Sequence, residues 1–119
     1  MAKKILIVDD DESILDAVSL VLEEEGYNVA VTTKGDEIFE KVKNFKPDAI
    51  LLDVLMSGKD GREICKKLKE DEKTKQIPVI MISAHPSAKE SVLSCGANAF
   101  LAKPFDTSDL TEIVSIFVA

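Results

Sequence analysis

Five short apolar runs divide the chain, and four of them end in a polar side chain. The runs are Lys4–Val8, Val29–Val31, Ala49–Leu52, Val79–Ile82 and Ala99–Ala102. Runs of aliphatic residues without alternation are typical of strands that are buried on both faces, as in a parallel sheet. The pattern therefore predicts five strands of one parallel sheet.

Apolar residues recur at helical spacing in the segments that follow each run. They are Ile14, Val18, Val21 and Leu22; Ile38, Val42 and Phe45; Ile64, Cys65 and Leu68; Ala88, Val92 and Leu93; and Leu110, Ile113, Val114 and Phe117. Asp11 is an expected N-cap of the first helix, and Gly26 and Gly96 are stop signals for the first and fourth. The second helix should end before Pro47 and the third should begin near Gly61.

Strict alternation of apolar strands and helices predicts an α/β fold, in which helices cover both faces of a parallel sheet. Right-handed crossovers restrict the topology to a few arrangements. The chain has 119 residues and shows neither an internal repeat nor a linker. We therefore expect one domain over residues 1–119.

The charge balance excludes some classes of function. Fifteen basic and 22 acidic residues give a net charge of −7, which argues against a nucleic-acid-binding surface. No run approaches the ~18 apolar residues of a membrane span, and no signal-peptide pattern opens the chain. We expect a cytoplasmic protein that binds neither nucleic acid nor a membrane. Cys65 and Cys95 lack CxxC spacing, so we expect buried free thiols rather than a disulfide.

The polar ends of the runs predict a shared site. Asp9 and Asp10 follow the first run, Asp53 the third, Ser83 the fourth and Lys103 the fifth. The carboxyl ends of parallel strands meet at one edge of the sheet, where ligands bind in open α/β folds. Carboxylates within about 5 Å of each other repel by roughly 3 kcal/mol per pair at an effective dielectric near 20. Such a cluster needs a cation, or one acid must take up a proton.

The residue types at this edge suit phosphoryl transfer. An all-oxygen site with few carboxylates and room for water suits Mg²⁺, which often bridges to phosphate. Lys103 adds an ammonium that can pair with Asp53 or with a phosphate oxygen, and Ser83 adds a hydroxyl. Taken singly, each residue has a structural explanation, such as an N-cap. Together they resemble a site with a carboxylate nucleophile, a divalent metal, an ammonium and a hydroxyl.

Four segments in this order resemble the receiver domain of two-component response regulators, and the resemblance covers residues 3–117. They are ILIVDDDESI, PDAILLDVLM, PVIMISA and GANAFLAKPF. The resemblance implies a flavodoxin-like, doubly wound five-stranded sheet of order 2-1-3-4-5 with five helices, in three α/β/α layers. It implies a phosphorylation-controlled signalling switch rather than an enzyme. The phosphoryl group would come from a sensor histidine kinase or a phosphotransfer protein.

The resemblance also implies a role for each acid. Asp53 matches the phospho-acceptor. Asp9 and Asp10 match the acidic pair that holds Mg²⁺, with Asp10 the more direct ligand. Asp53 and the backbone carbonyl of Leu55 match the remaining protein contributions to the metal.

The other matched positions concern the phosphoryl group and the signal. Ser83 and Lys103 match the residues that bind phosphoryl oxygens. Phe100 matches an aromatic switch residue that moves with Ser83, and Pro104 matches a proline after a cis peptide bond. The signal would leave through the face formed by the fourth helix, the fifth strand and the fifth helix, to a second copy of the chain or an output domain.

The chain departs from the family pattern beside the acceptor. Where many members have Met-Pro and then Gly, this chain has Met56, Ser57 and Gly61, which predicts a looser loop and intact chemistry. Leu55 and His85 stand at positions that tune hydrolysis of the aspartyl phosphate in the family. Leu55 offers no polar group to orient water, which predicts slow self-dephosphorylation.

Ile116 stands apart from the apolar stripe of the last helix, about 100° or more from its centre. It is either a single exposed apolar residue or part of a dimer or partner contact. Three other functions stay open at this point: a metal-dependent phosphatase with an aspartyl nucleophile, a flavodoxin-like cofactor binder, and a protein-binding pseudo-receiver. The chain suits either a complete single-domain regulator or the receiver part of a longer protein.

Overall fold

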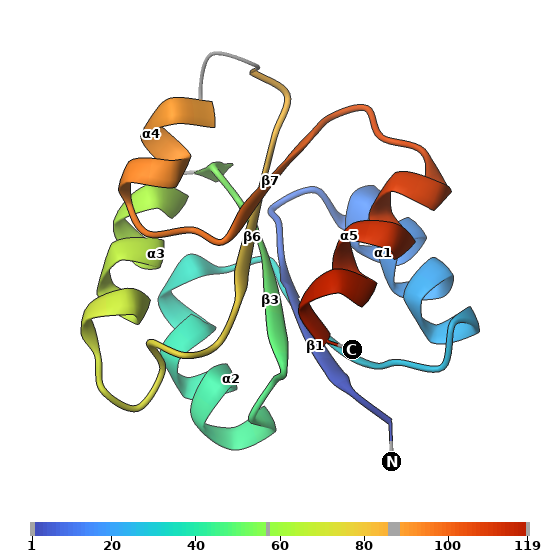
Figure 1. The fold of residues 1–119 in the computed structure, drawn as a ribbon, viewed down its shortest axis with the longest axis horizontal. Coiled ribbons are helices and arrows are strands. Elements are labelled where there is room, and N and C mark those ends of the chain that lie inside the picture. The colour runs from blue at the N-terminus through green and yellow to red at the C-terminus, as the bar shows by residue number, and fades with distance from the viewer. Residues whose placement is uncertain (1, 57, 86–88, 119) are drawn as a thin grey trace.

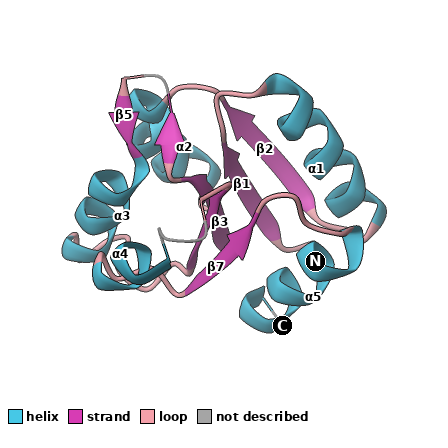
Figure 2. Cartoon of the chain, turned by 90° about the horizontal axis from the view of Figure 1, so that it is seen from above, coloured by secondary structure: helices cyan, strands magenta, loops and turns pink. Residues whose placement is uncertain are grey.

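A five-stranded parallel sheet forms the centre of the protein. The computed structural model describes residues 2–56, 58–85 and 89–118. The strands are β1 (Lys4–Val8), β2 (Asn28–Thr32), β3 (Ala49–Asp53), β6 (Val79–Ser83) and β7 (Ala99–Ala102). They pair in parallel in the order β2-β1-β3-β6-β7 (Figure 2). Counted among these five, the order is 2-1-3-4-5, so the predicted topology is confirmed.

Five helices cover the sheet. They are α1 (Glu12–Glu24), α2 (Ile38–Phe45), α3 (Gly61–Glu70), α4 (Lys89–Ser94) and α5 (Thr107–Val118). Helices α1 and α5 cover one face, and α2, α3 and α4 cover the other (Figure 1), which confirms the doubly wound α/β/α fold. Ala88, expected in the fourth helix, lies outside the described residues. Among the described residues, no helix is both long enough and apolar enough to cross a lipid bilayer.

Every aliphatic side chain of β1 and β3 is buried because each face of the sheet has its own core. Alternate residues of a strand point to opposite faces. Leu6, Val8, Ile50 and Leu52 join the core under α2, α3 and α4, and Ile5, Ile7, Ala49 and Leu51 join the core under α1 and α5. This two-sided burial explains why the runs show no polar alternation.

The helix boundaries follow from local chemistry. Asp11 caps α1 as predicted, with its carboxylate accepting from the Ser13 N–H at 2.9 Å. Gly26 follows the helix with a φ of +95°, a left-handed backbone that glycine adopts without strain. Asp60 caps α3 in the same way as Asp11 caps α1, accepting from the Arg62 N–H at 2.9 Å.

A small hairpin beside β3 was not predicted from the sequence. Strands β4 (Leu55–Met56) and β5 (Lys59–Asp60) pair antiparallel where a loop over 57–61 was expected. Gly58 supports the turn with a φ of +73°. Ser57 lies outside the described residues.

The last helix buries one stripe of residues. Leu110, Val114 and Val118 are buried, whereas Ile113 and Phe117 are only partly covered. Ile116 is 65% exposed, which confirms that it stands off the apolar stripe. The sequence stripe missed Val118, the last residue of α5, which is also buried.

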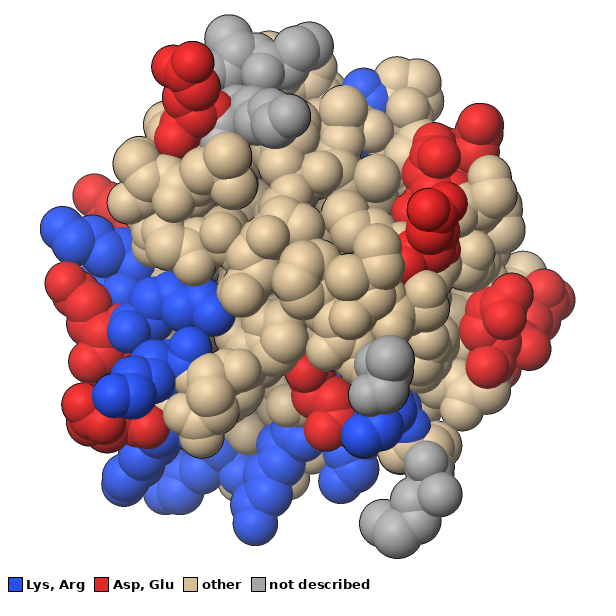
Figure 3. Space-filling view, viewed as in Figure 1, with Lys and Arg blue, Asp and Glu red and all other residues tan. Residues whose placement is uncertain are grey.

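Surface charge divides between the two helical layers. No lysine or arginine occurs between residues 5 and 33, the stretch that contains α1 and holds eight acids. Residues 104–119, which contain α5, carry three acids and no lysine or arginine. Figure 3 shows Asp and Glu along the margin over α1, and Lys and Arg gathered over α2 and α3.

Candidate functional site

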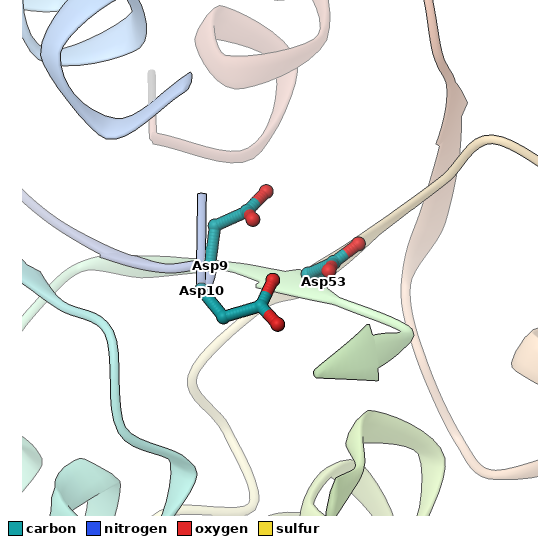
Figure 4. A group of neighbouring side chains, drawn as sticks. All are labelled: Asp9, Asp10 and Asp53. Atoms are coloured by element: carbon teal, nitrogen blue, oxygen red, sulfur yellow. The ribbon is translucent and has the colours of Figure 1, made fainter. Parts of the chain in front are cut away.

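Three aspartates meet at the carboxyl edge of the sheet. Asp9 directly follows β1 and Asp53 ends β3, and these strands pair in register. Carboxylate oxygens of Asp9, Asp10 and Asp53 all lie within 4.8 Å of one another (Figure 4). Asp9 is 1% exposed and Asp53 6%, whereas Asp10 stands at the exposed rim. The structure thus brings together the acids that the sequence singled out.

Lys103 is the ammonium that faces this cluster. Its Nζ lies 2.9 Å from Asp9 Oδ2 and 3.3 Å from Asp53 Oδ1. Burial acts to lower the pKa of Lys103, but the bonds to Asp9 and Asp53 together outweigh it and raise that pKa. Lys103 therefore remains charged, and one ammonium offsets part of the charge of three carboxylates.

Asp53 is an acid with a strongly perturbed pKa. Burial, and then repulsion from Asp9, raise the pKa of Asp53 from 3.8 to about 6, against the opposing effect of Lys103. A carboxyl group with this pKa is mostly ionised at neutral pH and mostly protonated at pH 5. Asp53 therefore combines an available carboxylate with an unfavourable environment, which is typical of reactive positions.

The three consecutive aspartates have different partners. Asp9 Oδ1 accepts from the Asp11 N–H at 3.0 Å, while Asp9 Oδ2 bonds Lys103. Asp11 uses its own carboxylate to cap α1. Asp10 points toward Asp53 across the cluster (Figure 4). Both carboxylate oxygens of Asp9 therefore accept hydrogen bonds, and the carboxylate of Asp11 caps α1.

Gly61 fixes the backbone around Asp53. Its N–H donates to the Val54 carbonyl at 2.6 Å, and the Val54 N–H donates to the Ile82 carbonyl at 2.9 Å. A Cβ atom at position 61 would collide with the backbone oxygen of Asp53. Glycine is required here because the start of α3 approaches β3 so closely.

The polar groups line a small cavity of about 240 Å³. Its walls come from Asp9, Asp10, Asp11, Asp53, Leu55, Ser83, Ala84, His85 and Lys103. Ser83 ends β6, and its Oγ accepts from the His85 N–H at 3.0 Å. The Ser83 carbonyl accepts from the Lys103 N–H at 2.8 Å, which joins β6 to the segment after β7. All the predicted polar site residues therefore border one space.

Two predicted positions, Phe100 and Pro104, do not line this cavity. Phe100 is partly buried in β7, opposite Met81 of β6, and packs against the core under α2, α3 and α4. The peptide bond between Lys103 and Pro104 is cis, as the resemblance implied. Phe100 does not border the cavity, so any role in signalling requires it to act through β6 or β7.

The donor set fits a magnesium ion. With all groups ionised, three carboxylates and one ammonium leave a net charge of −2 in a space that also admits water. Mg²⁺ prefers oxygen ligands, uses few carboxylates and retains several waters. Leu55 borders the same space and turns its side chain to the surface.

The sequence did not predict several contacts and strand ends around this site. It predicted that Lys103 pairs with Asp53 but not that its shorter bond is to Asp9. It placed Asp53 and Ser83 just beyond their strands, whereas the sheet ladder continues through both. The close approach of Gly61 to Asp53 is a contact between β3 and α3 that has no local sequence signal beyond the glycine itself.

Comparison with known proteins gives one consistent result. Residues 5–115 match the family model of the response regulator receiver domain. A solved structure from Chloroflexus aurantiacus, assigned as a response regulator, is 35% identical with a TM-score of 0.94, over 99% of this chain and 98% of that one. The chemotaxis response regulator CheY4 of Vibrio cholerae is 30% identical with a TM-score of 0.91, over 98% of this chain and 99% of that one.

A third similar structure bears on the metal. It is the receiver domain of a sensor histidine kinase from Pseudomonas aeruginosa, with a magnesium ion coordinated in its active-site cleft. It is 26% identical with a TM-score of 0.89, over 99% of this chain and 98% of that one. From its fold, its matched residues and these similarities, the chain belongs to the response regulator receiver domain family of two-component systems.

Proposed function

We propose that this domain is a phosphorylation-controlled switch in which Asp53 accepts a phosphoryl group in a Mg²⁺-dependent reaction. The donor is a phosphohistidine on a sensor histidine kinase or a phosphotransfer protein. The observation that most supports this proposal is Asp53 itself, a buried carboxylate that shares one cavity with Asp9, Asp10 and Lys103. Receiver domains in general are signalling domains rather than enzymes, and they interact with histidine kinases.

The proposed transfer is a direct displacement at phosphorus. A carboxylate oxygen of Asp53 attacks the phosphorus atom, the bond from phosphorus to the donor nitrogen breaks, and that nitrogen leaves with the electron pair. The pKa of Asp53, about 6, keeps the nucleophile ionised at neutral pH. Lys103 then offsets charge on the phosphoryl oxygens, and the Ser83 hydroxyl donates to one of them.

The metal would be held by Asp9, Asp10, Asp53 and the backbone carbonyl of Leu55. The first three are supported by the 4.8 Å grouping of their oxygens, and Leu55 borders the same cavity. Bound Mg²⁺ would offset the negative charge of the carboxylates and of the phosphoryl oxygens. Magnesium is typical of the family, as the P. aeruginosa receiver domain illustrates.

The signal would leave through the face formed by α4, β7 and α5, toward a second copy of the chain or an output domain. A phosphoryl group adds roughly −1.5 to −2 charges at the carboxyl edge. A local charge acts at a distance only through an element with two arrangements. Ser83 and Phe100 are the proposed element, because they lie on the paired strands β6 and β7. The apolar Leu55 at the rim supports slow hydrolysis of the aspartyl phosphate.

An aspartyl phosphatase is the competing function, and the geometry disfavours it. Phosphatases of similar topology usually place the nucleophile after the first strand, which is Asp9 here. Both oxygens of Asp9 are engaged, by Lys103 and by the Asp11 N–H. Asp53 is therefore the better nucleophile, and the intact set of acids, hydroxyl and lysine also disfavours a pseudo-receiver.

The test is to incubate the protein with a small phosphoramidate and Mg²⁺ and to locate the added mass by peptide mapping. We expect one phosphoryl group, on Asp53, and none on the Asp53→Asn variant. Asp16→Asn, which changes an exposed aspartate of α1 outside the cavity, should behave like the parent. Phosphoryl mass on Asp9, or on the Asp53→Asn protein, would contradict the assignment.

A further inference from the structure

The fold brings the two cysteines of the chain into contact. Cys65 lies in α3 and is fully buried, and Cys95 directly follows α4 and is partly exposed. The Cys65 thiol donates to the backbone carbonyl of Cys95 at 3.8 Å, and the Cys95 thiol donates to the Val92 carbonyl at 2.9 Å. Both are free thiols. Thirty residues of sequence separate them, so this contact is a product of the tertiary fold.

The two thiols differ in their access to reagents. Burial, and then the hydrogen bond with Cys95, raise the pKa of Cys65 to about 12, so Cys65 is a neutral thiol at physiological pH. A buried neutral thiol reacts slowly with a soluble oxidant, so Cys65 should not be the first of the two sulfurs to react with peroxide. Cys95 is partly exposed, and its side chain interacts electrostatically with the Arg62 guanidinium. Cys95 is therefore the sulfur that a soluble oxidant reaches first.

From this contact we propose that Cys65 and Cys95 are a redox modification site, which a peroxide converts into a reversible disulfide within one chain. The Cys95 thiolate attacks hydrogen peroxide, the O–O bond breaks, and Cys95 becomes a sulfenic acid while the released hydroxide takes up a proton. The Cys65 sulfur then attacks the Cys95 sulfur. The S–S bond forms as the S–O bond breaks, and the Cys65 proton leaves with the hydroxide. Two thiols and one peroxide thus give one disulfide and two waters.

The bond would tie α3 to the end of α4. Helix α4 has six residues, too few for a helix that is stable by itself, and of its side chains at positions 90–94 only Val92 is fully buried. The Arg62 Nη1 also donates to Ser91 Oγ at 3.0 Å, so α3 and α4 already touch beside the cysteines. A covalent link at Cys95 should therefore restrict the opening of α4. Cysteines in reducing compartments that form disulfides usually do so transiently, as redox sensors.

The test is to treat the folded protein with hydrogen peroxide and to analyse it by mass spectrometry without reduction. We expect the loss of two hydrogens, a linked pair of peptides that contain Cys65 and Cys95, and full reversal by dithiothreitol. Hydrogen exchange of the α4 amides should slow in the oxidised protein and recover on reduction. The measurement does not involve Asp53, so its result is independent of the phosphorylation proposal.

Two variants distinguish a redox site from the alternative that Cys65 and Cys95 only fill space in the core. In Cys65→Ala, Cys95 should pass to sulfinic acid because the resolving thiol is missing. In Cys95→Ala, Cys65 should stay reduced at the same peroxide concentration. The proposal is wrong if the parent accumulates Cys95 sulfinic acid while Cys65 remains alkylatable after denaturation. It is also wrong if peroxide links two chains instead of one, or leaves both thiols free.

Discussion

The interior of β3 and its carboxyl end adjoin each other but have opposite chemical character. Leu51 and Leu52 are fully buried among aliphatic side chains, and the next residue, Asp53, is a buried carboxylate beside Asp9. In the interior, burial stabilises the fold and carries no chemistry. At the end of the strand, burial raises the free energy of an ionised group and makes it reactive. One strand therefore supplies both the stability and the position that a destabilising group needs.

The sharpest test of this contrast is to weaken the interior. Leu51→Ala should lower the free energy of unfolding by about 2–5 kcal/mol, because it leaves a cavity in the core under α1 and α5. The remaining folded protein should still take up a phosphoryl group on Asp53. Urea denaturation and peptide mapping measure the two effects. A loss below about 1 kcal/mol would mean that the core collapses around the gap.

Unlike the aliphatic interior of β3, its carboxyl end should make the stability of the fold depend on pH. The folded-state pKa of Asp53, about 6, lies above its ordinary value of 3.8, so the folded protein binds the proton more tightly than the unfolded chain. The contribution of Asp53 is fully present below pH 3.8 and is lost as pH rises through about 6. The lost contribution is on the order of 2–3 kcal/mol. Other carboxyl groups titrate in the same range, so the quantity to measure is the parent minus Asp53→Asn.

Urea denaturation of the two proteins at several pH values, without divalent metal, gives that difference. The parent should lose stability relative to Asp53→Asn between pH 4 and pH 7. Added Mg²⁺ should reduce the loss, because a divalent cation stabilises the ionised form. Parallel pH profiles for the two proteins would show that Asp53 is not perturbed by its surroundings.

Removing Asp10 should separate function from stability. Asp10→Ala should leave the metal-free fold unchanged or stabilise it by up to about 1 kcal/mol, because it removes like-charge repulsion at an exposed site. Mg²⁺ affinity, measured by titration calorimetry, should fall strongly. Asp11→Asn, which keeps a competent N-cap beside the cluster, is the matched control. If Asp10→Ala binds Mg²⁺ as tightly as the parent, Asp10 is not a metal ligand. If the variant loses much stability, Asp10 has a structural role.

The smallest expected change in stability is that of a substitution on the exposed side of α5. Ile116→Glu should change stability by less than about 0.5 kcal/mol, because the side chain is already exposed. If Ile116 belongs to a contact on the face of α4, β7 and α5, the variant should lose phosphorylation-dependent association in light scattering. Leu20→Glu, the same change at a residue of α1 that is 60% exposed, is the control outside this face. Unchanged association would make Ile116 a single exposed apolar residue.

The sequence predicted the features that repeat along the chain. The five strands, the helices between them and the polar strand ends followed from the spacing of apolar residues and from a few turn signals. The hairpin β4–β5 was missed because each of its strands has only two residues and β5 contains only charged ones. The bond between Lys103 and Asp9 and the contact between Cys65 and Cys95 were missed because each joins distant segments. Such contacts depend on the packing of helices and strands, which no local pattern records.

At the carboxyl edge of the sheet, a bound divalent ion would take the place of the Lys103 ammonium as the counter-ion of the aspartates. The ammonium already serves as the counter-ion of Asp9 and Asp53, so an arriving divalent ion does not enter an uncompensated cluster. The free energy of Mg²⁺ binding therefore includes the cost of moving the Lys103 ammonium away from these two carboxylates. A measured dissociation constant for Mg²⁺ is therefore an exchange constant, which includes the cost of moving Lys103 to new acceptors. Phosphoryl oxygens are the acceptors that would take it up, so under the proposed mechanism metal and phosphoryl group should bind with positive cooperativity.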